Sequence, residues 1–117
     1  MKIENIKFKA KKLNSCEWVE GDLVHLGNRV CIGGDHLKDG IADVDPSTVC
    51  QFTGLKDKNG TPIYEGDIVI HKDNNAERRG DINWDSKAAA FCFGQGFLVN
   101  YPSENMVVIG NEFDKEE

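Results

Sequence analysis

Several features that would mark a membrane protein, a secreted protein or a common enzyme are missing from this sequence. No apolar run approaches the roughly 18 residues that a membrane-spanning helix needs. The charged opening segment MKIENIKFKAKK lacks the apolar core of a signal peptide. Dinucleotide-binding, P-loop, nucleophile-elbow and HExxH motifs are absent. We therefore expect a cytoplasmic protein with no membrane partner, no catalytic residues and no enzymatic activity.

The cysteines do not form a metal-binding pattern. Cys16, Cys31, Cys50 and Cys92 are widely and unevenly spaced, with no CxxC pair and no histidine at a zinc-finger distance. Cys50 and Cys92 stand among apolar neighbours, which is typical of buried thiols. The prediction is therefore no metal, no cofactor and reduced cysteines.

Basic residues are outnumbered. The chain has 14 lysines and arginines against 20 acidic residues, a formal net charge of −6. Proteins that bind a phosphate backbone usually carry a basic excess, so the balance disfavours nucleic acid as a partner. Two local basic clusters keep nucleic-acid binding as the alternative function, and they consist of Lys7, Lys9, Lys11 and Lys12, and of Arg78 and Arg79.

Short apolar segments separated by turn residues predict a mainly β fold, or a β-rich α+β fold. Gly27-Asn28 and Asn59-Gly60 are hairpin signals because both residue types tolerate positive φ. From Asp67 onward we expect five strands that form a small closed or partly open barrel. These strands are predicted at IVIH (68–71), DINW (81–84), AAFCF (89–93), FLVN (97–100) and MVVIG (106–110).

The length of 117 residues fits one domain spanning residues 1–117. We divide it into an amino-terminal β portion (1–50) with a Gly- and Asp-rich loop (33–45), a hairpin and barrel (51–113), and a frayed tail (114–117). Trp84 alternates with Ile82 and is predicted to be buried. Trp18 lies between Glu17 and Glu20 and is the better candidate for partial exposure.

The segment TVCQFTGLKDKNGTPIYEGDIV (48–69) resembles the signature of the YopX family. The segments IKFKAK, EWVEGDLV, VDPSTV and VVIGNEFD also resemble the family, so the similarity spans nearly the whole chain. The resemblance implies an origin in a phage or prophage of a bacterial host. It also implies a carboxy-terminal part similar to an SH3-like barrel, and it implies no established activity, ligand or catalytic residue.

We interpret the protein as a non-catalytic accessory module that binds a host or phage protein, with homo-oligomers left open. The alternative is an SH3-like barrel that binds nucleic acid, and a weaker one is a small hydrolase or metal enzyme. A polar-rimmed docking surface is one hypothesis for the signature, and turn architecture explains the same residue types at least as well. The candidate binding residues are Trp18, Asp57, Lys58, Tyr64, Glu65 and Asp67.

Overall fold

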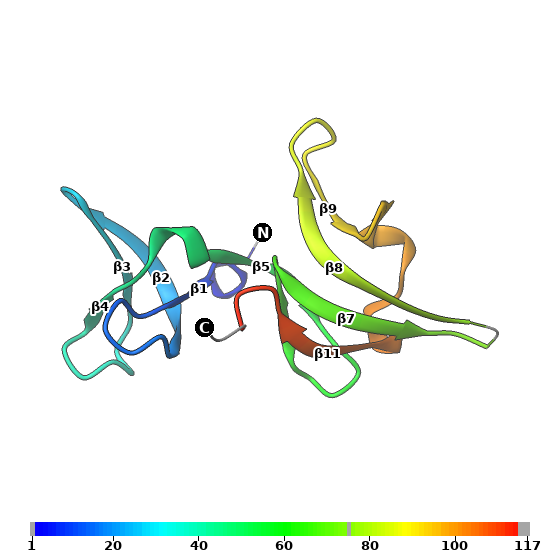
Figure 1. The fold of residues 1–117 in the computed structure, drawn as a ribbon, viewed down its shortest axis with the longest axis horizontal. Coiled ribbons are helices and arrows are strands. Elements are labelled where there is room, and N and C mark those ends of the chain that lie inside the picture. Colours follow the sequence, from blue (N-terminus) through cyan, green and yellow to red (C-terminus); the bar gives the residue numbers. More distant parts are fainter. Residues whose placement is uncertain (1, 75, 115–117) are drawn as a thin grey trace. The chain divides into compact units, whose positions relative to one another are not determined.

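The computed structural model describes residues 2–74 and 76–114, and none of these residues lies in an α-helix. They fall into two compact units, unit 1 ending at Phe52 and unit 2 beginning at Thr53 (Figure 1). The predicted mainly β class is confirmed. The prediction of a single domain over the whole chain stays a prediction.

Unit 1 is a curved antiparallel sheet with the strand order β4-β3-β2-β1-β5. The predicted Gly27-Asn28 turn joins β2 to β3 and is confirmed, whereas β4 was not predicted and lies inside the expected Gly- and Asp-rich loop. A single bridge between Lys12 and Val44 brings the chain after β1 to the end of β4. The elements are η1 (Ile3–Asn5), β1 (Phe8–Lys11), β2 (Trp18–Leu26), β3 (Arg29–Gly33), β4 (Ile41–Asp43), η2 (Pro46–Thr48) and β5 (Cys50–Lys56).

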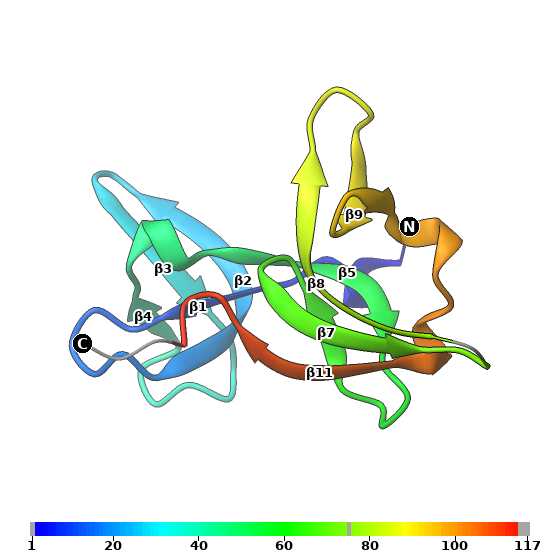
Figure 2. The same ribbon diagram turned by 45° about the vertical axis from the view of Figure 1, so that its right-hand side comes forward.

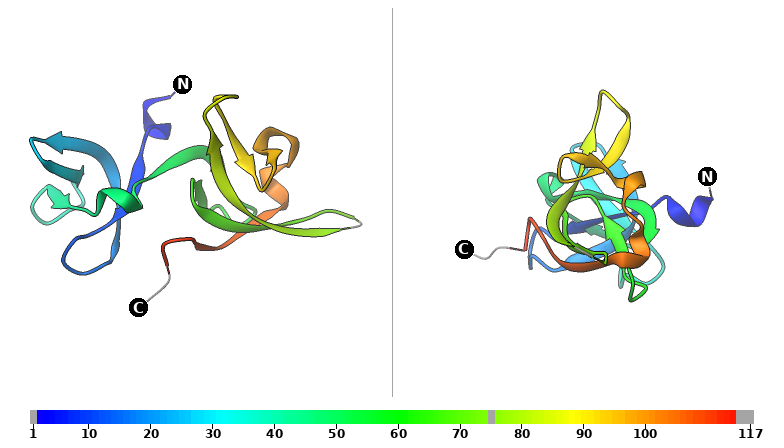
Figure 3. Two further views of the ribbon diagram at one scale, coloured as in Figure 1. Left: turned by 45° about the horizontal axis from the view of Figure 1, so that its top comes forward. Right: turned by 90° about the vertical axis from the view of Figure 1, so that its right-hand side faces the viewer.

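Unit 2 contains a second antiparallel sheet, ordered β10-β9-β8-β7-β11, in which β8 is long and strongly curved (Figures 2 and 3). The end of β5 continues into this unit and neighbours β6. The elements are β6 (Pro62–Tyr64), β7 (Asp67–Lys72), β8 (Glu77–Asp85), β9 (Ala90–Phe93), β10 (Gly96–Phe97), η3 (Leu98–Asn100), η4 (Ser103–Asn105) and β11 (Met106–Asn111).

The prediction from Asp67 onward was a closed or partly open barrel, and the five-stranded sheet of unit 2 is not closed into a barrel. The expected strand FLVN is extended only as far as Phe97, and Leu98–Asn100 then form a 3₁₀ turn. Leu98 is buried in the core by this turn instead of pairing along an edge. In the part of the chain that is described, β10 and β11 therefore do not pair and the sheet does not close. The likeness to an SH3-like barrel stays a prediction.

Each unit has its own apolar core, built from the inward side of alternating strand positions. In unit 1 the fully buried members are Ala10, Ile32 and Val44. The core of unit 2 is larger and comprises Ile63, Val69, Ile82, Phe93, Leu98 and Met106. The predicted burial of Cys50 and Cys92 is confirmed.

Two buried carboxylates bind the signature hairpins to the last strand. Asp67 accepts hydrogen bonds from the Tyr64 backbone N–H at 2.8 Å and from the Asn111 side-chain amide at 3.0 Å. Gly66, with φ of +89°, makes the turn that brings the Asp67 carboxylate back to Tyr64. The Asp67 side chain thus fixes both the bend before β7 and the end of β11.

Asp57 plays the corresponding part in the hairpin between β5 and β6. Its carboxylate accepts from the backbone N–H groups of Asn59 at 2.8 Å, Thr61 at 2.9 Å and Val108 at 2.9 Å. Burial alone raises the pKa of Asp57, but these backbone donors outweigh burial and hold the pKa below its ordinary value. Asp57 therefore caps the turn, in line with the turn architecture expected of the signature, and it also makes an unpredicted bond to β11.

The predicted frayed tail is described only at its first residue. Asp114 accepts a hydrogen bond from the Asn111 backbone N–H at 2.9 Å. Residues 115–117 lie outside the described residues.

Replacement of Asp67 by alanine is expected to lower the free energy of unfolding by at least about 2 kcal/mol. The change removes at least two buried hydrogen bonds, and each donor deprived of its partner costs about 1–3 kcal/mol. Urea titration followed by circular dichroism measures the effect. Asp35→Ala is the matched control, because Asp35 is exposed, and its stability should stay within about 0.5 kcal/mol of the parent. Equal stability of the two variants would contradict the structural role of Asp67.

Asp57 predicts a loss of stability in acid. Its folded-state pKa is depressed, so its contribution is present above the unfolded-state pKa of about 3.9 and is lost as pH falls through the folded-state pKa. Asp57→Asn should be less stable than the parent at pH 7 and should show a flatter decline below about pH 4. Urea titrations at stepped pH values test this. Asp35→Asn should keep the parent's slope, and a parent slope in Asp57→Asn would refute the assignment.

Candidate functional site

Alternate residues of β1 and the strands beside it form one face of unit 1 that combines lysines with aromatic rings. Because side chains alternate along a strand, Lys7, Lys9 and Lys11 lie on the same side of the sheet. Lys11 pairs across the strands with Trp18, and the Lys7 carbonyl accepts a hydrogen bond from the Phe52 backbone N–H. We call these five residues the lysine–aromatic face.

Cation–π contacts order the lysines of this face. The ammonium nitrogens of Lys9 and Lys11 lie 4.7 and 5.6 Å from the Trp18 ring centroid, and that of Lys7 lies 4.7 Å from the Phe52 ring centroid. Such contacts contribute about 0.5–1 kcal/mol each at exposed positions. Trp18 is half-buried, which agrees with its predicted partial exposure, while Phe52 is buried.

Acidic residues balance part of this charge. The Lys7 ammonium lies 3.6 Å from the Glu20 carboxylate, and the Lys12 ammonium lies 3.6 Å from the Glu17 carboxylate. Lys12 immediately follows Lys11, so strand alternation directs it toward the other side of the sheet. The lysine–aromatic face therefore keeps a local positive charge although the whole chain is acidic.

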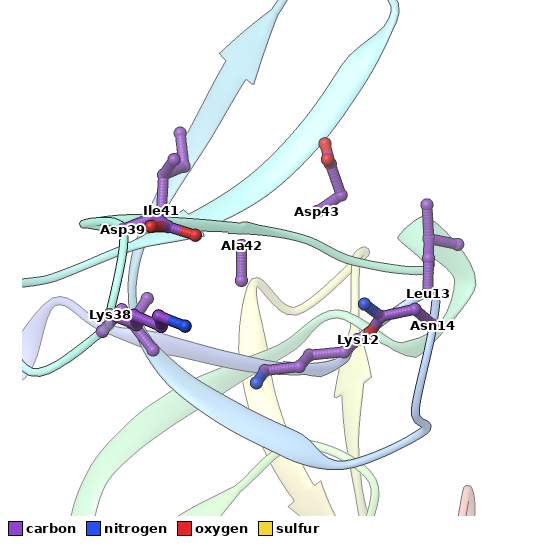
Figure 4. A pocket seen from close by; sticks show the side chains of 9 residues that line it. Lys12, Leu13, Asn14, Lys38, Asp39, Ile41, Ala42 and Asp43 are labelled. Carbon is purple, nitrogen blue, oxygen red and sulfur yellow. The ribbon is translucent and has the colours of Figure 1, made fainter.

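The other side of this region contains an open cavity of about 400 Å³ (Figure 4). Figure 4 shows Lys12 and Lys38 extending toward one another below the Ala42 methyl group, with the Asn14 amide beside Lys12. Asp39 and Asp43 also line the cavity, so cationic and anionic groups are mixed there. This mixture of charges points to no single ligand chemistry.

Asp43 also belongs to a small polar cluster across β3 and β4. It accepts from the Arg29 Nε at 2.8 Å and from the Cys31 thiol at 3.3 Å. The hydrogen bond from Arg29, aided by that from Cys31, lowers the pKa of Asp43. Burial, with the Asp43 carboxylate beside it, raises the pKa of the Cys31 thiol, so Cys31 is poorly suited to act as a nucleophile.

The candidate residues of the signature lie in unit 2, and most of their polar atoms are used within it. Asp57, Tyr64 and Asp67 are buried, with the carboxylates engaged as described above. Lys58 is exposed, Glu65 is partly exposed, and the Lys58 backbone N–H donates to the Met106 carbonyl at 2.9 Å. A binding role for these residues stays a prediction.

The remaining basic pair, Arg78 and Arg79, lies in β8 of unit 2 and is exposed. The structure thus joins Trp18 with three of the lysines, which the sequence analysis had assigned to competing hypotheses. The alternation of Lys7, Lys9 and Lys11 in the sequence indicated that these lysines share a side of the sheet. Only the pairing of β1 with β2 shows that Trp18 lies beside them.

The predicted burial of Trp84 is wrong, since 47% of its surface is exposed. Trp84 pairs with Phe91 one step beyond the core pair Ile82 and Phe93, near the tip of the β8–β9 hairpin. Its ring meets the Phe91 ring edge-on at 5.0 Å between centroids. Alternation therefore predicted the correct side of the strand but could not indicate where the core ends.

The described residues contain neither a metal site nor a membrane-spanning helix. Among residues 2–74 and 76–114, no three histidine, cysteine or acidic side chains are gathered as a metal site requires. None of the helical segments in the same residues is both long and apolar enough to cross a bilayer.

Comparison with known proteins agrees with the signature recognised above. A search of curated proteins found no match. The family model described as YopX protein matches residues 2–117, which is essentially the entire chain. The protein with this lysine–aromatic face and these two carboxylate-bound hairpins is therefore a member of the YopX family.

Proposed function

We propose that this YopX protein is a non-catalytic, phage-derived module that binds a protein partner in the bacterial cytoplasm through the lysine–aromatic face. The observation that carries the proposal is the row of Lys7, Lys9 and Lys11 held over Trp18 and Phe52. Tryptophan with a charged rim is a frequent anchor of protein interfaces. Because the face is positive, the partner segment is acidic.

Charge is distributed unevenly between the units, which supports a positive face on unit 1 and an acidic partner. Unit 1 has seven basic and eight acidic residues, and unit 2 has seven basic and twelve acidic residues. The lysines of the face are therefore the best-developed positive feature of the more nearly neutral unit. Electrostatic complementarity of this kind steers encounter and excludes partners of the wrong sign.

Nucleic acid is the less favoured partner for the same face. The Glu20 carboxylate lies 3.6 Å from the Lys7 ammonium, and it would repel a phosphate that approaches this face. Two ammonium groups also lie over the Trp18 ring, where a base would have to stack. An acidic peptide requires neither free ring faces nor a long basic track.

The proposal predicts that charge reversal on the face weakens the binding of acidic peptides. The double variant Lys9→Glu/Lys11→Glu should bind a glutamate-rich peptide at least tenfold more weakly than the parent in calorimetric titration. The control Lys56→Glu/Lys87→Glu makes the same change in net charge at two exposed positions of unit 2 and should change affinity less than twofold.

The same titration separates the alternatives. An oligothymidine that binds more tightly than the peptide, with a steep loss of affinity as salt rises, would replace the proposed partner with nucleic acid. Equal weakening by both double variants would show that net charge, and not this face, determines binding. Affinity capture from host lysate with the parent and both variants then identifies partners whose retention depends on Lys9 and Lys11.

A further inference from the structure

A hollow in unit 2 lies on the side of the sheet that faces away from the core. Val69 and His71 of β7 are buried on the core side. Alternation along the strand therefore places Ile70 and Lys72 on the opposite side. Val107 of β11 pairs directly with Ile70, so it shares that side. The hollow that these side chains help to line has a volume of about 340 Å³, within the roughly 300–1,000 Å³ of small-ligand sites.

The floor of this hollow is aliphatic. Ile70 and Val107 are half-buried, and Ile109 is 45% exposed. The register of β11 against β7 shifts between Val108 and Gly110, so Ile109 lies in an irregular step of the strand beside the hollow. Aliphatic side chains gathered in a hollow are stabilised when an apolar group covers them. The floor therefore suits the aliphatic part of a ligand.

Two lysines line the rim of the hollow. The Lys58 backbone N–H donates to the Met106 carbonyl at 2.9 Å, which holds the β5–β6 loop beside β11. The Lys58 ammonium makes no ion pair or hydrogen bond with any described residue. The Lys72 ammonium lies 3.8 Å from the Glu77 carboxylate, but both side chains are more than half exposed, so this ion pair is weak. Both ammonium groups are therefore available to the anionic end of a ligand.

The 3₁₀ turn before β11 supplies hydrogen-bond acceptors to the same hollow. Glu104 and Asn105 of η4 line it, and the Glu104 carboxylate makes no ion pair with any described residue. In the unit 1 cavity, by contrast, Lys12 and Asp43 already have partners within the protein. The Glu104 carboxylate and the Asn105 side-chain carbonyl accept hydrogen bonds, so they suit an N–H group that lies close to the ligand's anionic end.

We propose that this hollow binds an aliphatic α-amino acid unit with a free carboxylate, either a free amino acid or the last residue of a peptide. The aliphatic side chain covers Ile70, Val107 and Ile109. The carboxylate binds the ammonium groups of Lys58 and Lys72. The nitrogen of the unit, an ammonium or an amide, donates to the acceptors of η4. This site is in unit 2 and does not depend on the lysine–aromatic face of unit 1.

NMR titration of the isotope-labelled full chain with leucine and with N-acetyl-leucine tests the proposal. The variant Lys58→Gln/Lys72→Gln should weaken binding at least tenfold. The control Lys56→Gln/Lys87→Gln makes the same change in net charge at exposed positions outside the hollow and should change affinity less than twofold. Absence of binding of both probes at millimolar concentration, or equal weakening by both double variants, would overturn the proposal.

A second pair of variants tests the aliphatic floor. Ile109→Ser should weaken the tighter of the two probes at least fivefold, because it removes exposed aliphatic surface from the hollow. Val99→Ser is the control, since Val99 is 88% exposed and lies outside the hollow, and it should change affinity less than twofold. Thermal unfolding verifies that both variants are folded. Equal affinity of Ile109→Ser and the parent would refute the floor.

Analogues of the probes test each group of the ligand. N-acetyl-leucinamide lacks the carboxylate, N-acetylglycine lacks the aliphatic side chain, and isocaproate lacks the nitrogen, so each should bind at least fivefold more weakly than the tighter probe. Equal binding of any one of them contradicts the amino acid unit. Tighter binding of leucine assigns the ligand to a free amino acid, and tighter binding of N-acetyl-leucine assigns it to the end of a peptide.

Discussion

The arrangement of unit 2 depends on carboxylate groups that are buried where apolar side chains would be expected. Asp57 and Asp67 reach partners 51 and 44 residues away in sequence, at Val108 and Asn111. Burying a carboxylate is costly unless its oxygens are satisfied, and here each oxygen has at least one donor. Contacts within unit 2 thus explain the presence of these two acidic residues in the signature.

The turns could be predicted from the residue types at each turn. The features that could not be predicted depend on packing between segments that are distant in sequence. Gly27-Asn28 and Asn59-Gly60 were identifiable because a positive φ favours glycine or asparagine in any protein. Leu98 looked like a strand residue, yet burial beside Ile82 and Met106 drew it into a 3₁₀ turn. The position of Trp18 beside the lysines likewise depends on which strands pair, and strand pairing cannot be predicted from a short stretch of sequence.

The lysine–aromatic face of unit 1 is partly ordered before any partner binds. In unit 1 the rings of Trp18 and Phe52 restrict flexible lysines, so part of the entropy lost on binding has already been lost on folding.

The hydrogen bonds from the β5–β6 loop to β11 also occupy backbone groups at the edge of the sheet. β11 is an edge strand, and edges carry backbone groups that can recruit a strand of another molecule. The Lys58 N–H occupies the Met106 carbonyl and the Asp57 carboxylate occupies the Val108 N–H, so two outward groups are capped. The signature loop therefore leaves fewer backbone groups on this edge open to a strand of another molecule.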